Sequence, residues 1–337
     1  MTLVTATLMS FALGILLTYL VRALGTKYRV GIDADRDVPR LGGLAIIGSV
    51  IVTLAVISPP GDQKLFAFAG ALTVSTIGLL DDFGMGRGPA LKLAVSLAAA
   101  ASTLYATGAY VAHINTPPLS DLFAIRPIAI AVSVIALAGM CHGVNLIDGI
   151  HGLALSFAVI AFGALGVIAV SVGERQIALV ALSLLGACLG LMAFNFPSGS
   201  IFLGDVGTYF IGFIAAWIAI YLCHEYETVS PWAMVCIFAY PIVDVGYAAA
   251  RRGLRGQNPM CGDREHLHHR LMRLTGRLRS NNLRETVIIT TLSCAIVGFV
   301  PAAIAAMNFD QPPVLMALAA TSVAALVSIN WIASLAA

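Results

Sequence analysis

The sequence predicts an all-α, polytopic integral membrane protein with about 11 transmembrane helices. Of the 337 residues, 59% are hydrophobic and only 11% are charged, whereas soluble domains carry about 25% charged residues. The mean hydropathy is +0.92. Apolar runs of about 20 residues, the length that crosses a bilayer core about 30 Å thick, recur along the whole chain. Such a composition cannot cover a globular surface with polar groups, so lipid is the expected solvent.

Each predicted span is one of these apolar runs. The first, from Leu3 to Leu24, has no basic residue before it and is followed by Lys27 and Arg29. A secretory signal has the opposite polarity, so this run is expected to remain as the first span. In order, the predicted spans are 3–24, 42–58, 64–80, 90–110, 126–144, 152–172, 176–194, 208–224, 231–250, 286–306 and 313–334. Because no fixed-period repeat or low-complexity linker divides them, residues 1–337 are expected to form a single integral-membrane domain.

The basic residues predict the orientation. Eleven spans put the termini on opposite sides, and with the N-terminus outside only Lys64, Arg126 and Arg175 of the 19 basic residues fall outside. Cytoplasmic loops carry an excess of Lys and Arg, so we expect a cytoplasmic C-terminus and a multi-pass protein of the cell inner (plasma) membrane. The candidate site loops that would face the cytoplasm are about 25–41, 81–92, 145–152, 195–207 and 251–285.

The net charge and the cysteine spacing argue against nucleic-acid binding, a disulfide framework and a zinc knuckle. The net charge is +2, which provides no basic face for nucleic acid. The six cysteines include no C-x-x-C pair, and five of them lie in apolar runs. This pattern argues against a disulfide framework or a zinc knuckle.

Polar residues cluster at the predicted cytoplasmic ends of the spans. Asp81 and Asp82 follow the third span, and the segments 145–152, 202–207 and 266–269 follow later spans. Each cluster has a structural alternative, namely a solvated loop, a helix cap or a turn. Ionisable groups at membrane depth are costly and are usually functional. Their placement on one membrane face predicts a shared polar site.

The residue types in these clusters suit phosphate chemistry. Adjacent carboxylates at Asp81 and Asp82 repel each other unless a cation or Lys92 relieves them, and hard oxygen donors suggest Mg²⁺. A helix beginning near Asp205 could bind an anion at its N-terminus. The histidines at 266, 268 and 269, interleaved with Arg264 and Arg270, suit hydrogen bonds to phosphate oxygens. Zinc is not favoured, because no cysteine accompanies them and the spacing differs from H-E-x-x-H.

Five segments in order resemble the polyprenyl-phosphate N-acetylhexosamine-1-phosphate transferase superfamily, of the glycosyltransferase family 4 type. They are PRLGG at 39–43, GLLDD at 78–82 with Lys92 downstream, NLIDGIHGL at 145–153, FLGDVG at 202–207 and DREHLHHRL at 263–271. The His-x-His-His form is similar to the branch that acts on undecaprenyl phosphate and N-acetylglucosamine 1-phosphate. The phospho-N-acetylmuramoyl-pentapeptide branch instead has three consecutive histidines.

The resemblance implies a reaction and a set of residue roles. A UDP-N-acetylhexosamine would give its sugar 1-phosphate to undecaprenyl phosphate in the bilayer, release UMP and initiate a cell-envelope glycan such as lipopolysaccharide O-antigen. Mg²⁺ is the implied cofactor, with Mn²⁺ as an alternative, and a homodimer is left open. The implied catalytic residues are Asp81, Asp82, Lys92 and Asp148, and the implied metal ligands are Asp205 and Asn145. The implied substrate-binding residues are Gly42, Gly43, His151, Phe202, Arg264, His266, His268 and His269.

One residue departs from the family pattern, and two other interpretations stay open. His151 stands where the family usually carries Asp or Asn, at a position near the uracil in relatives. A secondary transporter would place polar groups near the membrane midplane on broken helices, but Asp244 is the only acidic residue well inside an apolar run and lies toward its cytoplasmic end. A catalytically silent homologue would have lost acidic groups, whereas this chain carries all of the principal ones.

Overall fold

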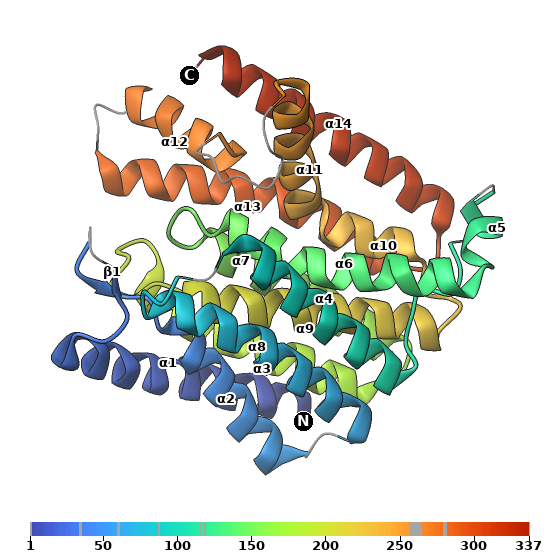
Figure 1. The fold of residues 1–337 in the computed structure, drawn as a ribbon, viewed down its shortest axis with the longest axis horizontal. Helices are drawn as coiled ribbons and strands as arrows, with labels where there is room; N and C mark the ends of the chain where they lie inside the picture. Colours follow the sequence, from blue (N-terminus) through green and yellow to red (C-terminus); the bar gives the residue numbers. More distant parts are fainter. Residues whose placement is uncertain are drawn as a thin grey trace.

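The computed structural model describes residues 2–33, 36–58, 61–86, 88–114, 116–117, 119–256, 265–278 and 282–336. It confirms an all-α, polytopic membrane protein, with one two-stranded hairpin as its only sheet in these ranges (Figure 1). The helices are α1 (Thr2–Tyr28), α2 (Gly42–Ile57), α3 (Asp62–Asp82), α4 (Pro89–Thr107), α5 (Leu119–Phe123), α6 (Arg126–Ile147), α7 (Leu153–Ser171), α8 (Arg175–Asn195), α9 (Gly204–Glu225), α10 (Pro231–Ile237), α11 (Ala239–Leu254), α12 (Leu267–Leu278), α13 (Leu283–Met307) and α14 (Pro312–Ala336). The strands are β1 (Ile32–Asp33) and β2 (Val38–Pro39), which pair antiparallel.

Every predicted span coincides with a helix or a helix pair, but two spans differ from the prediction. Within the described residues, nine helices are long and apolar enough to cross a membrane, and α10 with α11 forms a tenth candidate bent by 75°. Helix α2 has only 16 residues and is shorter than the predicted run at 42–58. The number of spans and the orientation of the termini therefore stay predictions.

A proline accounts for the break between α10 and α11. Proline lacks a backbone N–H, so Pro241 cannot donate the helical hydrogen bond to the carbonyl of Ile237. Ile237 is the last residue of α10, and the chain bends at Phe238 before α11 begins. The predicted continuous span at 231–250 is thus two helices. Its second half, α11, leaves the direction of the bundle and approaches α14 (Figure 1).

Helix α9 forms the core of the bundle. Every residue from Val206 to Cys223 is buried, and α2, α3, α6 and α7 pack around it (Figure 1). Glycines allow the close approaches: a Cβ on Gly78 of α3 or Gly212 of α9 would lie 2.6 Å from a backbone oxygen of the neighbouring helix. Small residues favour such packing in lipid, where dispersion contacts replace the hydrophobic drive. The ends of α3 and α6 are thereby held next to the N-terminus of α9.

Two elements outside the bundle complete the end that carries the polar clusters. The β1–β2 hairpin lies within the predicted loop at about 25–41, and α12 packs on α13 and α14. In Figure 1 both β1 and α12 lie toward the same end of the helices. The histidines of the sequence motif stand at the start of α12, so its docking decides where they point.

Replacing Gly186 in α8 by Ala should lower the stability of the fold. The new Cβ would lie 2.3 Å from the backbone oxygen of Thr7 in α1, and overpacking of this kind costs about 1–3 kcal/mol. Gly253 in α11 is the matched control, because nothing lies within 4 Å of a Cβ built there. The midpoint of thermal unfolding in detergent measures both variants. Equal midpoints would contradict the packing of α1 on α8.

Candidate active site

The carboxylate of Asp82 caps the N-terminus of α9. Its side chain is fully buried, and it accepts hydrogen bonds from the backbone N–H groups of Asp205 and Val206, each at 3.0 Å. The first N–H groups of a helix have no partner within the helix and carry partial positive charge. Arg40 adds an ion pair between its Nε and Oδ1 of Asp82 at 3.3 Å. Asp82 thus fixes the backbone that presents Asp205.

Lys92 and Arg40 surround the carboxylate of Asp205. Nζ of Lys92 lies 3.4 Å from Oδ2 of Asp205 and also pairs with the carboxylate of Asp81. Nη2 of Arg40 lies 3.3 Å from Oδ1 of Asp205. The repulsion expected between Asp81 and Asp82 is avoided because their carboxylates have different cationic partners. Asp81, Asp82, Lys92 and Asp205, far apart in sequence, form one cluster.

This cluster is rich in carboxylates. Asp33 joins it at 3.8 Å from Nη1 of Arg40, so among the described residues four carboxylates lie around Arg40 and Lys92. In the described part of the chain, no three His, Cys, Asp or Glu side chains converge as a metal site. Mg²⁺ typically uses one or two carboxylates and fills its remaining positions with waters and substrate phosphates. The donor set therefore fits a divalent cation that binds together with a phosphate ligand.

Asn145 is held beside the same helix end. Its Nδ2 donates to Oγ1 of Thr208 at 3.0 Å, and Oγ1 of Thr208 donates to the backbone oxygen of Asp205 at 3.1 Å. With the amide nitrogen engaged, the side-chain oxygen is the atom that could act as a metal ligand.

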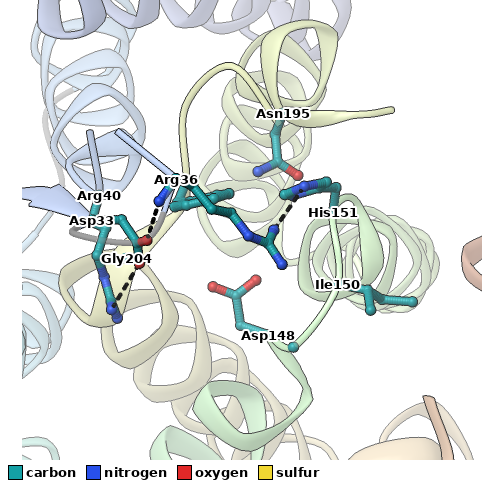
Figure 2. Close-up of a pocket in the computed structure, with 10 residues that line it drawn as sticks. Asp33, Arg36, Arg40, Asp148, Ile150, His151, Asn195 and Gly204 are labelled. Atoms are coloured by element: carbon teal, nitrogen blue, oxygen red, sulfur yellow. Dashed lines mark hydrogen bonds and ion pairs between the residues drawn. The ribbon is translucent and has the colours of Figure 1, made fainter. Parts of the chain in front are cut away.

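A polar cavity of about 230 Å³ opens next to the cluster (Figure 2). It is lined by Asp33, Arg36, Arg40, Asp148, Gly149, Ile150, His151, Asn195, Phe202 and Gly204. Asp148 points toward the middle of this group in Figure 2. Burial raises the pKa of Asp148 well above its ordinary value, and repulsion from Asp205 acts in the same direction. Asp148 therefore holds a proton more readily than an exposed carboxyl group.

His151 and Phe202 form an aromatic stack in this cavity. Their ring centres are 5.2 Å apart with the planes inclined by 11°. Nη1 of Arg36 lies 3.0 Å from Nε2 of His151, and its guanidinium lies 5.5 Å from the ring centre of Phe202. Burial and the charge of Arg36 lower the pKa of His151 to about 4. His151 is therefore neutral near pH 7, with Nε2 accepting from Arg36 and Nδ1 carrying the proton.

Gly42 and Gly43 pack against the segment that carries Phe202. Their backbone N–H groups donate to the carbonyl oxygens of Phe202 and Leu203, and a Cβ on Gly43 would lie 2.3 Å from Cα of Gly207. Both glycines are buried, and neither lines this cavity. The structure gives them a packing role that sets the position of Phe202, and the substrate binding that the resemblance implies for them stays a prediction.

The histidine segment, residues 266–269, packs against the loop between α6 and α7. His268 is fully buried, and a Cβ on Gly149 would lie 2.1 Å from its Nε2. Burial lowers the pKa of His268 to about 3. His269 and His151 both line a second cavity of about 370 Å³, which shares Arg36, Gly149 and Ile150 with the first cavity. The histidine segment thus closes one side of the polar site.

Comparison with known proteins identifies the family. Residues 65–223 match the family model "Glycosyl transferase family 4". A protein of Bacillus subtilis, described as a probable undecaprenyl-phosphate N-acetylglucosaminyl 1-phosphate transferase, is 31% identical over 242 residues, which span 71% of this chain and 66% of the relative. The chain belongs to glycosyl transferase family 4.

Two further relatives of this family 4 protein extend the match. An undecaprenyl-phosphate alpha-N-acetylglucosaminyl 1-phosphate transferase of Yersinia pestis is 24% identical over 83% of this chain and 77% of its own length. A decaprenyl-phosphate N-acetylglucosaminephosphotransferase of Mycolicibacterium smegmatis is 28% identical over 91% of this chain and 82% of its own length. The activities named for these relatives indicate an enzyme, so the transporter interpretation is set aside.

The structure also shows site residues of the family 4 protein that the sequence did not single out. Arg36, Arg40 and Asp33 contribute side chains from the hairpin region, and Asp244 accepts a hydrogen bond from Nδ1 of His266 at 2.8 Å. Arg40 lies within the PRLGG segment, and Asp244 is the isolated acid in an apolar run. The sequence pattern could therefore have pointed to both residues. No such pattern pointed to Arg36. The predicted substrate contact at Arg264 lies outside the described residues.

Replacing Gly149 by Ala in the family 4 protein should loosen α12. The new methyl group would occupy the place of the His268 ring, and a rigid ring cannot yield without shifting its backbone. We expect faster hydrogen exchange of the amides of α12 and unchanged exchange in α9. Gly139→Ala on α6 is the control, because nothing lies within 4 Å of its Cβ. Identical exchange of α12 in the two variants would show that His268 does not rest on Gly149.

Proposed function

We propose that this protein transfers an N-acetylhexosamine 1-phosphate from a UDP-sugar to undecaprenyl phosphate and releases UMP, with UDP-N-acetylglucosamine as the first candidate donor. The names of the relatives support a polyprenyl-phosphate acceptor and an N-acetylglucosamine phosphate group. The observation that carries the proposal is the cluster of Asp81, Lys92, Arg40 and Asp205 at the capped N-terminus of α9. It provides anionic ligands and fixed cations at one point.

The chemistry fits this arrangement because phosphoryl transfer needs alignment and positive charge more than covalent help from the protein. An oxygen of the lipid phosphate attacks the phosphorus that carries the sugar, and the bridging oxygen leaves with UMP. A lipid phosphate is already ionised near neutral pH, so the step needs no strong base. Lys92, now paired with Asp81 and Asp205, would neutralise phosphate oxygens as they enter.

Asp205 and the side-chain oxygen of Asn145 would hold the proposed Mg²⁺, or Mn²⁺ in its place. The cation would neutralise charge on the diphosphate when bound. Arg40 keeps Asp205 oriented through one carboxylate oxygen, and Asp82 keeps its backbone in place. Asp81 would position the acceptor through Lys92.

The nucleotide would occupy the cavity beside Phe202. A flat base can stack in the layer formed by Phe202 and His151. Arg36 occupies Nε2 of His151, so the neutral ring offers its Nδ1–H to a base carbonyl. This differs from the acceptor that an Asp at that position would supply. The active site would face the cytoplasm of the plasma membrane, where nucleotide sugars are available, and the product would start a cell-envelope glycan such as O-antigen.

A donor panel tests this function. Purified protein with undecaprenyl phosphate and Mg²⁺ should release UMP from at least one of UDP-N-acetylglucosamine, UDP-N-acetylgalactosamine and UDP-N-acetylmuramoyl-pentapeptide. Chelation by EDTA should stop the release, and Mg²⁺ or Mn²⁺ should restore it. Turnover of the pentapeptide donor alone would move the protein to the other branch. No UMP from any donor would overturn the proposal.

Asp205→Asn and Asp81→Asn should each lower turnover at least tenfold, a rise of about 1.4 kcal/mol in the activation barrier. The first loses a charged metal ligand, and the second loses the charge that holds Lys92. Asp121→Asn, at an exposed position of α5, is the control and should keep full turnover. Initial rates of UMP release measure all three. Full activity in both site variants would refute the assignment of the site even if the enzyme class is right.

A further inference from the structure

Side chains from two other helices hold the turn that carries His151 between α6 and α7. Gly152, the next residue, has a φ of +82°, a conformation that glycine adopts without strain. Its backbone N–H donates to Oδ1 of Asn195, the last residue of α8, at 2.7 Å. The backbone oxygen of His151 accepts from Oγ1 of Thr291 in α13 at 2.9 Å. This oxygen and this N–H belong to one peptide group, so its plane is held at both ends.

Thr291 uses its hydroxyl differently from several other helical threonines of this chain. Thr7, Thr73 and Thr107 donate to the carbonyl oxygen four residues earlier in their own helices, which is a common local partner of a threonine in a helix. Thr291 is only 1% exposed, and it donates instead to a backbone oxygen 140 positions away in the sequence. Its hydroxyl therefore ties α13 to the turn between α6 and α7.

Asn195 connects the same turn to the segment before Phe202. Its Nδ2 donates to the backbone oxygen of Ile201 at 2.8 Å, and its own backbone oxygen accepts from the N–H of Gly199 at 2.8 Å. A Cβ on Gly199 would lie 2.4 Å from Nε2 of His151, so the ring of His151 packs against this segment. Figure 2 shows Asn195 next to His151. One amide side chain thus joins the backbone that follows His151 to the backbone that precedes Phe202.

The orientation of this peptide group decides where the ring of His151 points. Peptide groups are planar, so the direction in which a side chain leaves the backbone follows from the two planes beside it. The ring stacks on Phe202 and accepts a hydrogen bond from Arg36, and rotation of the peptide plane would move it away from both. Thr291 lines neither of the two cavities described at the site. Its effect on a ligand would therefore pass through His151.

We propose that Thr291 is a positioning residue, which holds the peptide plane beside His151 and thereby keeps the ring of His151 in the layer that receives the base of the donor. Asn195 holds the opposite end of the same peptide group. The hydroxyl of Thr291 sets the fit of the donor without taking part in the transfer. This role rests on the proposed function, because it takes the UDP-sugar as the ligand of the cavity.

Thr291→Val tests this role because it replaces the hydroxyl by a methyl group at nearly the same volume. We expect the KM for the UDP-sugar to rise about three- to tenfold, the range for the loss of one hydrogen bond between neutral groups, while the KM for undecaprenyl phosphate stays as in the wild type. Thr291→Ser keeps the donor and should keep both KM values. Thr290→Val is the matched control, because Oγ1 of Thr290 is also buried and has no hydrogen-bond partner among the described residues.

Nitrogen-15 NMR of histidine-labelled protein tests the geometry without turnover. The His151 signals, assigned with His151→Gln, should show one tautomer with a protonated Nδ1 in the wild type, because Arg36 donates to Nε2. Thr291→Val should show a mixture of both tautomers, because the ring is no longer held against Arg36, whereas Thr290→Val should keep the wild-type signals.

Several outcomes would overturn the proposal. A Thr291→Val protein with the wild-type KM for the donor, or with the single wild-type tautomer, contradicts it. An equal rise in both KM values, or the same effects from Thr290→Val or Thr291→Ser, would show a general packing role and contradicts it as well. If no donor releases UMP, the proposed function fails, while the NMR still decides whether Thr291 positions His151.

Discussion

The bond between the carboxylate of Asp82 and the N-terminus of α9 is the interaction on which the site depends. It joins the end of α3 to α9, which is buried from Val206 to Cys223. Because the first N–H groups of α9 carry partial positive charge, a negative side chain is stabilised there. The same bond sets the direction of Asp205, since the N–H of Asp205 is one of the two donors. Lys92 and Arg40 then add their charges around a backbone that is already fixed.

The position of this cluster follows from the cost of charge in lipid. A carboxylate surrounded by hydrocarbon is unstable, so the bundle places its charges where α9 begins and where neighbouring helices cover them. Asp81, Lys92 and Asp205 keep between 14% and 18% of their side chains exposed, which leaves them accessible to a phosphate. Asp82, in contrast, has no exposed side-chain surface, and its contacts are with other groups of the protein. Burial thus separates the carboxylate that holds the site together from those that can meet a substrate.

Much of this arrangement could be predicted from the sequence, and the parts that could not share a cause. The apolar runs predicted the positions of the long helices, because length and composition decide whether a helix suits a bilayer. The bend at Phe238 also had a local signal in Pro241, although a continuous span was predicted there. The pairing of Arg36 with His151 joins residues 115 positions apart and depends on how the hairpin settles over the α6–α7 loop. No pattern of residue types along one segment carries that information.

Two buried acids, Asp82 and Asp244, show why local capping rules miss the key contacts. Helix α9 begins after Leu203, which offers no polar side chain, and its cap comes from Asp82 at the end of α3. Helix α12 likewise receives its cap from Asp244 on α11. Capping by a distant side chain joins two helices by charge as well as by packing, so any movement of α3 or α11 moves the start of α9 or α12. Asp205 and His266 stand at those two helix starts, and each is thereby oriented by an acid on another helix.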